Sequence, residues 1–258
     1  MTAITHGAHH DHGRPIQVRH VSIWRPFVWL GRATSDLVGC APGNLGHGLL
    51  MVVLGWMLLL LLGRHPYYVA AAVSGFLLVA PIMTTGICEL SRLRATGRPL
   101  GFEASLEALA REGRDLFRFG AVLTAVAVLW FIISQVMLAD VLGVPAQSLA
   151  DTYYRGFVDT ASRPQLVAYV CTGAVLALVV FVLSVVTVPY MIDRETTAGE
   201  AMRASLHAVA ANPLAMLVWA AVLTVLTVAG FATALVGMIV IIPLLGHATW
   251  HAYRELIG

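Results

Sequence analysis

Long apolar runs alternate with polar or amphipathic segments along most of the chain. Each run approaches the roughly 20 residues that an α-helix needs to cross the hydrocarbon core of a bilayer. The last two runs follow each other without a polar loop, and we place a hairpin near Gly230 because one uninterrupted helix would be about twice as long as the bilayer is thick. The pattern predicts six spans, over residues 45–62, 67–88, 116–138, 166–192, 213–230 and 233–253.

Amphipathic segments precede the first, third and fifth spans. Apolar residues recur there at helical spacing, which predicts three helices that lie on the membrane surface. A tryptophan in the first segment is typical of the headgroup region. The apolar stripes consist of Trp24, Phe27, Val28, Leu30, Thr34 and Leu37 in the first segment, of Phe102, Leu106 and Leu109 in the second, and of Met202, Leu206 and Val209 in the third.

The second and third of these units resemble each other in sequence. When the chain is shifted by 100 residues, 101–131 aligns with 201–231 without a gap and shares 11 identities in 31 positions. Pro81, Pro189 and Pro243 each lie in the cytoplasmic half of an even-numbered span, where proline is expected to kink the helix. With a weaker match near the N-terminus, the chain predicts three repeats over about 22–92, 99–192 and 196–256, each a cytoplasmic surface helix followed by a transmembrane hairpin.

Composition agrees with this all-α, polytopic membrane fold. Of the 258 residues, 59% are hydrophobic and 12% are charged, about half the charged share of a soluble domain. All 16 basic residues are arginines; 13 fall on one side of the predicted spans and three on the other. The positive-inside rule therefore places both termini in the cytoplasm. The net charge of +2, without a basic patch interleaved with aromatics, argues against nucleic-acid binding.

Known catalytic patterns are missing from the sequence. It has no nucleophile elbow, P-loop, zinc-protease helix or carboxylate pair. No charged side chain lies deep in a span, which argues against a proton-coupled transporter or pump. The three cysteines are isolated and suggest neither a disulfide framework nor a zinc site. We therefore expect a non-enzymatic protein: a polar tail over 1–21 and one transmembrane domain over 22–258.

Histidines give the only candidate metal ligands. The N-terminal tail, which we expect to be disordered, carries His6, His9, His10 and His12. Clustered imidazoles can hold copper, nickel or zinc. The alternative is a flexible tail that binds no metal and no other cofactor.

A second histidine group is expected near the cytoplasmic boundary. His247 and His251 stand four residues apart on the last span, and His47 and His207 fall at a similar depth. Four imidazoles at one depth could bind a transition metal or the edge of a haem. The two histidines of the last span cannot ligate one haem by themselves, because a single helix cannot reach both of its faces. The alternative is that all four are interfacial side chains that cap helix ends or bind carbonyls freed near Pro243.

Charged residues cluster after the even-numbered spans. They could form a ring of ion pairs at the cytoplasmic face, although solvated charges at helix ends are the simpler interpretation. The residues concerned are Glu89, Asp193 and Glu195 with Arg92, Arg94 and Arg194.

The C-terminal half resembles a known family. The segment DRETTAGEAMRASLHAVAANPLAMLVWAAVLTV, followed by IVIIPLLGHATWHAYRE, is similar to an uncharacterised bacterial family of integral membrane proteins. The resemblance extends over roughly 20–256 and implies an inner-membrane location. Some members of that family are labelled as cytochrome c oxidase subunits. A haem–copper catalytic subunit looks like about twelve spans with histidines on several of them, so the resemblance implies an accessory or assembly role instead.

Three functions remain open at this point. The leading hypothesis is an accessory or assembly subunit that packs beside a larger membrane complex. Its expected partners are the lipid bilayer and other membrane-protein subunits. The second is a transporter or channel for an uncharged or lipid-like solute, suggested by the kinked hairpins. The third is metal or haem binding at His47, His207, His247 and His251.

Overall fold

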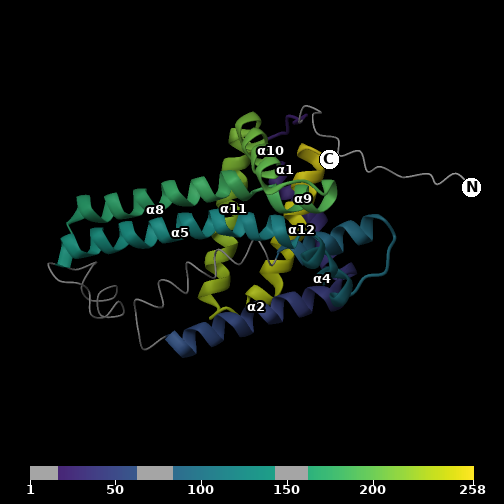
Figure 1. The fold of residues 1–258 in the computed structure, drawn as a ribbon, viewed down its shortest axis with the longest axis horizontal. Helices are drawn as coiled ribbons and strands as arrows, with labels where there is room; N and C mark the ends of the chain where they lie inside the picture. Colours follow the sequence, from purple (N-terminus) through teal and green to yellow (C-terminus); the bar gives the residue numbers. More distant parts are fainter. Residues whose placement is uncertain (1–16, 63–83, 143–161) are drawn as a thin grey trace, which may run out of the picture.

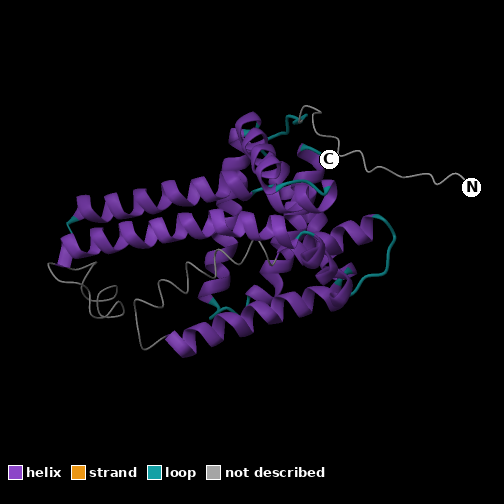
Figure 2. Cartoon of the chain, in the orientation of Figure 1, coloured by secondary structure: helices purple, strands orange, loops and turns teal. Residues whose placement is uncertain are grey.

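The structure is a computed structural model that describes residues 17–62, 84–142 and 162–258. Among these residues it is helical throughout and contains no strand (Figure 2). A further helix without a label covers 84–95. The labelled helices are α1 (Arg25–Gly39), α2 (Ala41–Leu62), α4 (Phe102–Arg111), α5 (Gly113–Leu142), α8 (Arg163–Ser184), α9 (Thr187–Arg194), α10 (Ala198–Ala211), α11 (Pro213–Ala232) and α12 (Met238–Leu256).

Four stretches of the described chain are long and apolar enough to cross a membrane. They are Ala41–Leu58, Gly113–Ser134, Arg163–Arg194 and Pro213–Ala232, and they confirm the first, third, fourth and fifth predicted spans as candidates. Most of the second predicted span, and the turn before it, lie outside the described residues. The six-span hairpin architecture is therefore not confirmed.

The sixth predicted span forms a helix but is not among these candidates. Its helix, α12, starts at Met238 rather than at 233, and its last three turns carry His247, His251 and Arg254. The His247 and His251 side chains face other helices, as described below. The hairpin that we expected near Gly230 also lies later, because α11 continues to Ala232.

The α11–α12 turn explains why Gly230 does not form the hairpin. Ala234 and Leu235 adopt φ values of 51° and 69° and take the left-handed positions of the turn. Gly230 instead lies inside α11, where an added Cβ would come within 2.6 Å of the Met238 sulfur. The glycine allows the two helices to approach closely at the start of α12.

Figure 1 shows α5 and α8 side by side as a long antiparallel pair. α11 and α12 run across the direction of this pair, and α2 lies on the other side of α12. The described helices therefore do not form one parallel bundle. α12 makes its most extensive contacts with α1 and α2, so the C-terminal helix lies at the centre of the described structure.

Each of the three predicted amphipathic segments is a helix, and each joins the following long helix through a single residue. Cys40 separates α1 from α2, Glu112 separates α4 from α5, and Asn212 separates α10 from α11. All three junction residues are buried, with exposed fractions of 1%, 7% and 5%. The described chain thus contains three junctions at which a one-residue break separates an amphipathic helix from a long apolar helix.

The amphipathic helices pack through narrow faces of small or polar residues rather than through their large apolar stripes. The buried face of α10 consists of Ala198, Ala201, Ala204, Ser205 and Ala208, whereas Leu206 is 49% exposed. In α4 the buried residues are Ser105 and Ala108. The larger apolar side chains are left partly exposed, as expected for helices whose apolar face contacts lipid.

Helix α1 also leaves most of its predicted apolar stripe exposed, but it buries one large side chain, Trp29. Its buried residues are Pro26, Trp29, Ala33 and Asp36. Trp24 and Phe27, from the predicted stripe, are 66% and 51% exposed, and their rings lie 6.1 Å apart. The face that points into the protein is therefore the one that carries Asp36.

Candidate functional site

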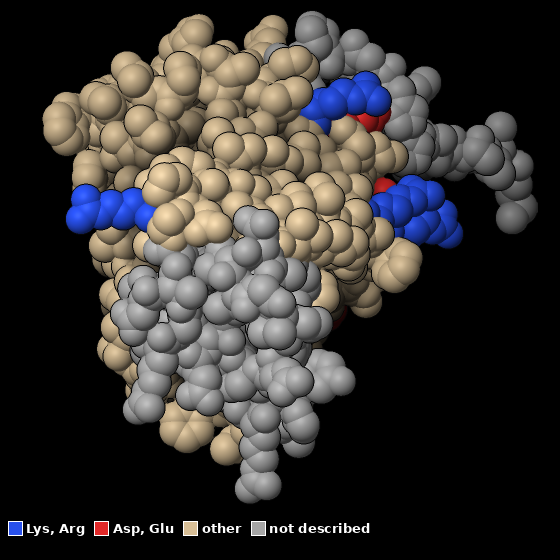
Figure 3. Space-filling model, turned by 90° about the vertical axis from the view of Figure 1, so that its left-hand side faces the viewer, with Lys and Arg blue, Asp and Glu red and all other residues tan. Residues whose placement is uncertain are grey.

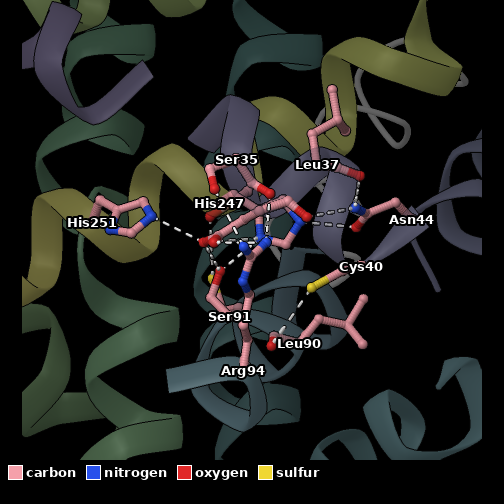
Figure 4. Close-up of polar contacts among 12 residues, drawn as sticks. Ser35, Leu37, Cys40, Asn44, Leu90, Ser91, Arg94, His247 and His251 are labelled. Carbon is pink, nitrogen blue, oxygen red and sulfur yellow. Dashed lines mark hydrogen bonds and ion pairs between the residues drawn. The ribbon is translucent and has the colours of Figure 1, made fainter. Parts of the chain in front are cut away.

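Four helices meet at a buried polar cluster around Asp36. The cluster consists of Asp36 from α1, Asn44 from α2, Ser91 and Arg94 from the 84–95 helix, and His247 and His251 from α12. We call these six residues the Asp36 cluster. Figure 4 shows His247 between Asn44 on one side and Ser91 on the other. The cluster joins segments more than 200 residues apart in sequence.

His247 is fully buried and uses both ring nitrogens. Its Nε2 lies 2.9 Å from Asn44 Oδ1, and its Nδ1 lies 2.6 Å from Ser91 Oγ. The Asn44 side-chain amide in turn donates to the Leu37 carbonyl at 2.9 Å. Asn44 therefore satisfies a carbonyl near the end of α1 and leaves its Oδ1 to accept from the imidazole.

The second α12 histidine contacts the carboxylate directly. His251 Nε2 lies 2.9 Å from Asp36 Oδ2, and its side chain is 22% exposed. The spacing of four residues places both imidazoles on one side of α12, as the sequence predicted. Asp36 Oδ2 also accepts from Ser91 Oγ at 3.2 Å.

Arg94 closes the cluster on its outer side. Its Nη1 lies 3.4 Å from Asp36 Oδ1, and the guanidinium also donates to the carbonyl and hydroxyl of Ser35. Burial by itself raises the pKa of the Asp36 carboxyl. The hydrogen bond from His251, the nearby imidazoles and the Ser91 hydroxyl outweigh burial and hold that pKa below its ordinary value of 3.8.

The hydrogen bonds of Ser91 depend on the proton at His247. The serine hydroxyl has one hydrogen, and both His247 Nδ1 and Asp36 Oδ2 lie within reach. With a neutral imidazole that donates to Asn44, Nδ1 must accept the Ser91 hydrogen. With a charged imidazole, Nδ1 donates to Ser91 and the hydroxyl turns to Asp36. The cluster can therefore accommodate a proton on His247 without moving a heavy atom.

The order of contacts differs from that of a nucleophilic triad. In such a triad the carboxylate binds the histidine and the histidine binds the serine. Here Asp36 contacts the Ser91 hydroxyl, while His247 Nδ1 is 3.9 Å from Asp36 Oδ2. Ser91 is only 2% exposed. The geometry is that of a hydrogen-bond network that joins helices and can hold an additional proton on His247.

His47, three residues after Asn44 on α2, forms a separate contact with α4. Its Nε2 lies 2.8 Å from Ser105 Oγ of α4, and its ring lies 4.9 Å from that of Phe102. The Ser105 hydroxyl donates to the Phe102 carbonyl. The Nδ1 of His47 is buried and has no hydrogen-bond partner among the described residues.

The four histidines of the predicted boundary site are thus only partly brought together. His247 and His251 converge on Asp36, His47 binds Ser105, and His207 is exposed on α10. Within the described ranges, no group of three or more His, Cys, Asp and Glu side chains has the geometry of a metal site. Metal or haem binding by these histidines stays a prediction. The tail histidines His6, His9, His10 and His12 lie outside the described residues.

A second polar contact fixes the end of α12 to α1. Arg25 forms a two-pronged ion pair with Glu255, and Trp29 Nε1 donates to the same carboxylate at 3.2 Å. Burial by itself raises the pKa of the Glu255 carboxyl. The hydrogen bonds from Arg25 and Trp29 outweigh burial, so the pKa lies below its ordinary value of 4.5. Neither Arg25 nor Glu255 stood out as a site residue in the sequence.

Ion pairs also form among the charges that follow the even-numbered spans. Glu89 pairs with Arg92 at 2.6 Å and with Arg111 at 3.7 Å, and it is only 2% exposed. The interpretation of a solvated charge is therefore wrong for Glu89, because Arg92 and Arg111 compensate a carboxylate that is shielded from water. The interpretation of a solvated charge is correct for Glu195, whose side chain is 73% exposed.

The sequence missed Asp36, Asn44 and Ser91 as partners of the histidines. A weak signal was present, because two imidazoles on one face of an otherwise apolar helix need acceptors and donors from neighbouring helices. Asp36 was placed off the apolar stripe of its helix. Nothing in the sequence indicated that this polar face turns inward.

Comparison with known proteins gives one match. Residues 69–193 match a family described as "Predicted integral membrane protein (DUF2189)". The matched region contains Ser91 and Arg94 but ends before the C-terminal segment on which the resemblance was most specific. Neither a curated protein nor a solved structure matches the chain. Residues 69–193, slightly less than half of the chain, are therefore similar to a family of predicted integral membrane proteins whose function is unknown.

Proposed function

We propose that the protein is a non-enzymatic subunit of the bacterial inner membrane that packs beside a larger membrane complex in an accessory or assembly role. The observation that carries the proposal is the outward exposure of the α5–α8 pair. In the apolar window of Gly113–Ser134 only 17% of the residues are buried within the chain, and in that of Arg163–Arg194 only 6%. Two long apolar helices therefore offer most of their surface to lipid or to another protein.

The character of this surface supports a membrane partner. Val136 and Val170, on α5 and α8, are each 65% exposed. Viewed from the end to which α5 and α8 extend, the described surface is almost entirely uncharged, with arginines only towards its edges (Figure 3). The pair itself is held by internal contacts, such as the 2.8 Å hydrogen bond between Ser134 and Tyr169. A rigid apolar pair of this kind can dock without first being ordered.

Six spans and a cytoplasmic location of both termini belong to the same proposal. The helices α1, α4 and α9 and the C-terminus lie towards the right in Figure 1, while α5 and α8 extend to the left. Most of the arginines fall on those right-hand segments and their neighbours, as the positive-inside rule requires of a cytoplasmic side. α12 would complete the sixth span by keeping its polar side chains against α1, α2 and 84–95.

One pocket among the described residues, between α8, α9, α11 and α12, gives no support to a channel for a polar solute. Its walls within the described structure are mainly apolar, whereas a path for a polar solute needs hydrogen-bonding groups along its length. A transporter or channel for an uncharged or lipid-like solute stays a prediction from the sequence.

Site-specific photo-crosslinking in intact membranes tests the proposal. A photoreactive residue at Val136 or Val170 is expected to capture a distinct membrane protein. Matched positions on α11, Val225 and Val228, are also more than 60% exposed and are expected to give lipid adducts only. Lipid adducts alone at all four positions would overturn the assignment of α5–α8 as the docking surface.

A further inference from the structure

The three junction residues allow the packing of the amphipathic helices to be compared position by position. Three positions are matched, four residues before each junction residue, four after it and seven after it. At the first junction they hold Asp36, Asn44 and His47, at the second Ala108, Leu116 and Phe119, and at the third Ala208, Met216 and Trp219. All nine side chains are buried. The matched positions are therefore interior at every junction, but only the first junction fills them with polar groups.

Packing alone does not require polar side chains at the first junction. The junctions of α4 and α10 are closed by an alanine before the break and larger apolar side chains after it. A buried polar network is often no more stable than apolar side chains of similar volume, because its charged and polar groups must give up water. The Asp36 cluster is therefore expected to have a role other than added stability.

The cluster restricts which surface can lie against α1. The Asp36 carboxylate is satisfied by Ser91, Arg94 and His251, which come from the 84–95 helix and α12. A buried donor or acceptor without a partner costs more than a paired one contributes. The inward face of α1 therefore accepts only a neighbour that brings complementary polar groups.

The face against which α10 packs is of a different kind. α10 lies against α8 and α9, and the buried side chains of α9 are Thr187, Val188, Pro189, Met191 and Ile192. The Thr187 hydroxyl already donates to the Leu183 carbonyl, and none of these five side chains can compensate a carboxylate. If α1 lay on this face, Asp36 would be buried without a partner.

We propose that the Asp36 cluster determines which helix α1 packs on, because its carboxylate admits α12 and excludes the apolar face of α9. The chain contains three amphipathic helices, and an alanine face alone would not distinguish one resting place from another. A buried polar contact does distinguish them, since a wrong pairing leaves charges unmatched. The inference does not depend on the proposed role as a subunit.

Spin-label distances in the full-length protein test the inference. Gly31→Cys labels α1 at a position where a Cβ meets nothing within 4 Å, and Val240→Cys labels α12 at an exposed position. Cys171→Ser removes the exposed native thiol. Double electron–electron resonance in lipid vesicles then measures the distance between the two labels. With the cluster intact, one narrow distance is expected.

An apolar variant gives the first junction the character of the second. It carries Asp36→Ala, Asn44→Leu, Ser91→Ala and His247→Leu. We expect it to resist unfolding by sodium dodecyl sulfate at least as well as the unaltered protein, but to show a second or much broader distance. The matched control, Ser205→Ala with Met216→Leu, changes two buried positions around the third junction and is expected to keep one narrow distance.

An exchange of partners provides a second, independent test. Asp36→His alone places two imidazoles and Arg94 together and is expected to give two distances. Asp36→His with His251→Asp restores complementary groups and is expected to give one. The inference is overturned if the folded apolar variant keeps one narrow distance, or if it unfolds more easily than the unaltered protein, because the network would then serve stability. One narrow distance for Asp36→His alone would also overturn it.

Discussion

Gly48 of α2 lies directly against the backbone of Ile239 in α12, at the carbonyl that Pro243 leaves without its helical donor. Proline has no N–H, so the Ile239 carbonyl loses the bond that residue 243 would otherwise make. A Cβ at Gly48 would contact that oxygen and lie 2.8 Å from the Ile239 Cα. The kink proline and the glycine together allow α2 and α12 to pack backbone against backbone.

Gly48→Ala is therefore expected to destabilise the protein. The atoms that a new methyl group would meet belong to the backbone and cannot rotate away, so α2 and α12 must separate. We expect a loss of about 1–3 kcal/mol, as for overpacked cores, measured as a lower midpoint of thermal unfolding in detergent. Gly31→Ala is the control, because a Cβ there meets nothing within 4 Å. An unchanged midpoint for Gly48→Ala would refute this close approach.

Asp36→Asn tests whether the carboxylate holds the four helices together. The substitution removes the charge that faces His251, Ser91 and Arg94 while keeping the side-chain volume. We expect a loss of about 1–3 kcal/mol, because asparagine keeps only one acceptor oxygen and turns an NH2 donor towards a partner that also donates. Unfolding by sodium dodecyl sulfate, monitored by circular dichroism, measures the loss.

The control for this variant is Glu107→Gln, at an exposed position on α4. It removes one negative charge without touching the cluster and is expected to leave unfolding unchanged. Equal effects of Glu107→Gln and Asp36→Asn would mean that net charge, and not the contacts of Asp36, decides stability.

The two histidines of α12 are expected to differ in importance. His247→Ala opens a cavity, leaves Asn44 Oδ1 without its donor and removes one of the two partners of the Ser91 hydroxyl, so we expect a loss of about 2–4 kcal/mol. His251→Ala removes one hydrogen bond at a partly exposed position and is expected to cost about 1 kcal/mol. The same unfolding assay ranks them, and the opposite order would contradict the geometry of the cluster.

Acid is expected to weaken the contacts of α1 with α12. The carboxyls of Asp36 and Glu255 both have a pKa below the ordinary values of 3.8 and 4.5. A carboxyl with a lowered pKa in the folded state contributes stability above its ordinary pKa and loses it as the pH falls through the folded value. Midpoints of thermal unfolding between pH 7 and pH 3 should therefore drop steeply at the acidic end.

The double variant Asp36→Asn, Glu255→Gln isolates these two groups. Its midpoint is expected to be lower at neutral pH and to change less on acidification than that of the unaltered protein. The same slope in both proteins would show that other carboxyls cause the acid sensitivity.

The sequence predicts much of the fold because the relevant signals are local. Apolar runs identified the helices of four candidate spans, and helical spacing identified α1, α4 and α10. It could not show which face of these helices packs, because the buried face of α10 is mostly alanine and contributes little to an apolar pattern. The turn at Ala234 and Leu235 was missed for a similar reason, since neither residue type favours a left-handed backbone.

The candidate site was predictable only in part. The four-residue spacing of His247 and His251 places them on one helix face, and that expectation is confirmed. Their shared partner, Asp36, lies 215 residues from His251 in sequence. No local pattern connects residues so far apart, because the contact depends on how α1 packs across α12.

Recovery of the protein from its own membrane tests the proposed role most directly. The full-length chain is extracted in mild detergent, and mass spectrometry identifies and quantifies the proteins that elute with it. We expect a distinct membrane protein in fixed stoichiometry, lost when bulky charged residues replace both Val136 and Val170 and retained when they replace Val225 and Val228. A single monodisperse species that contains only copies of this chain would contradict the account.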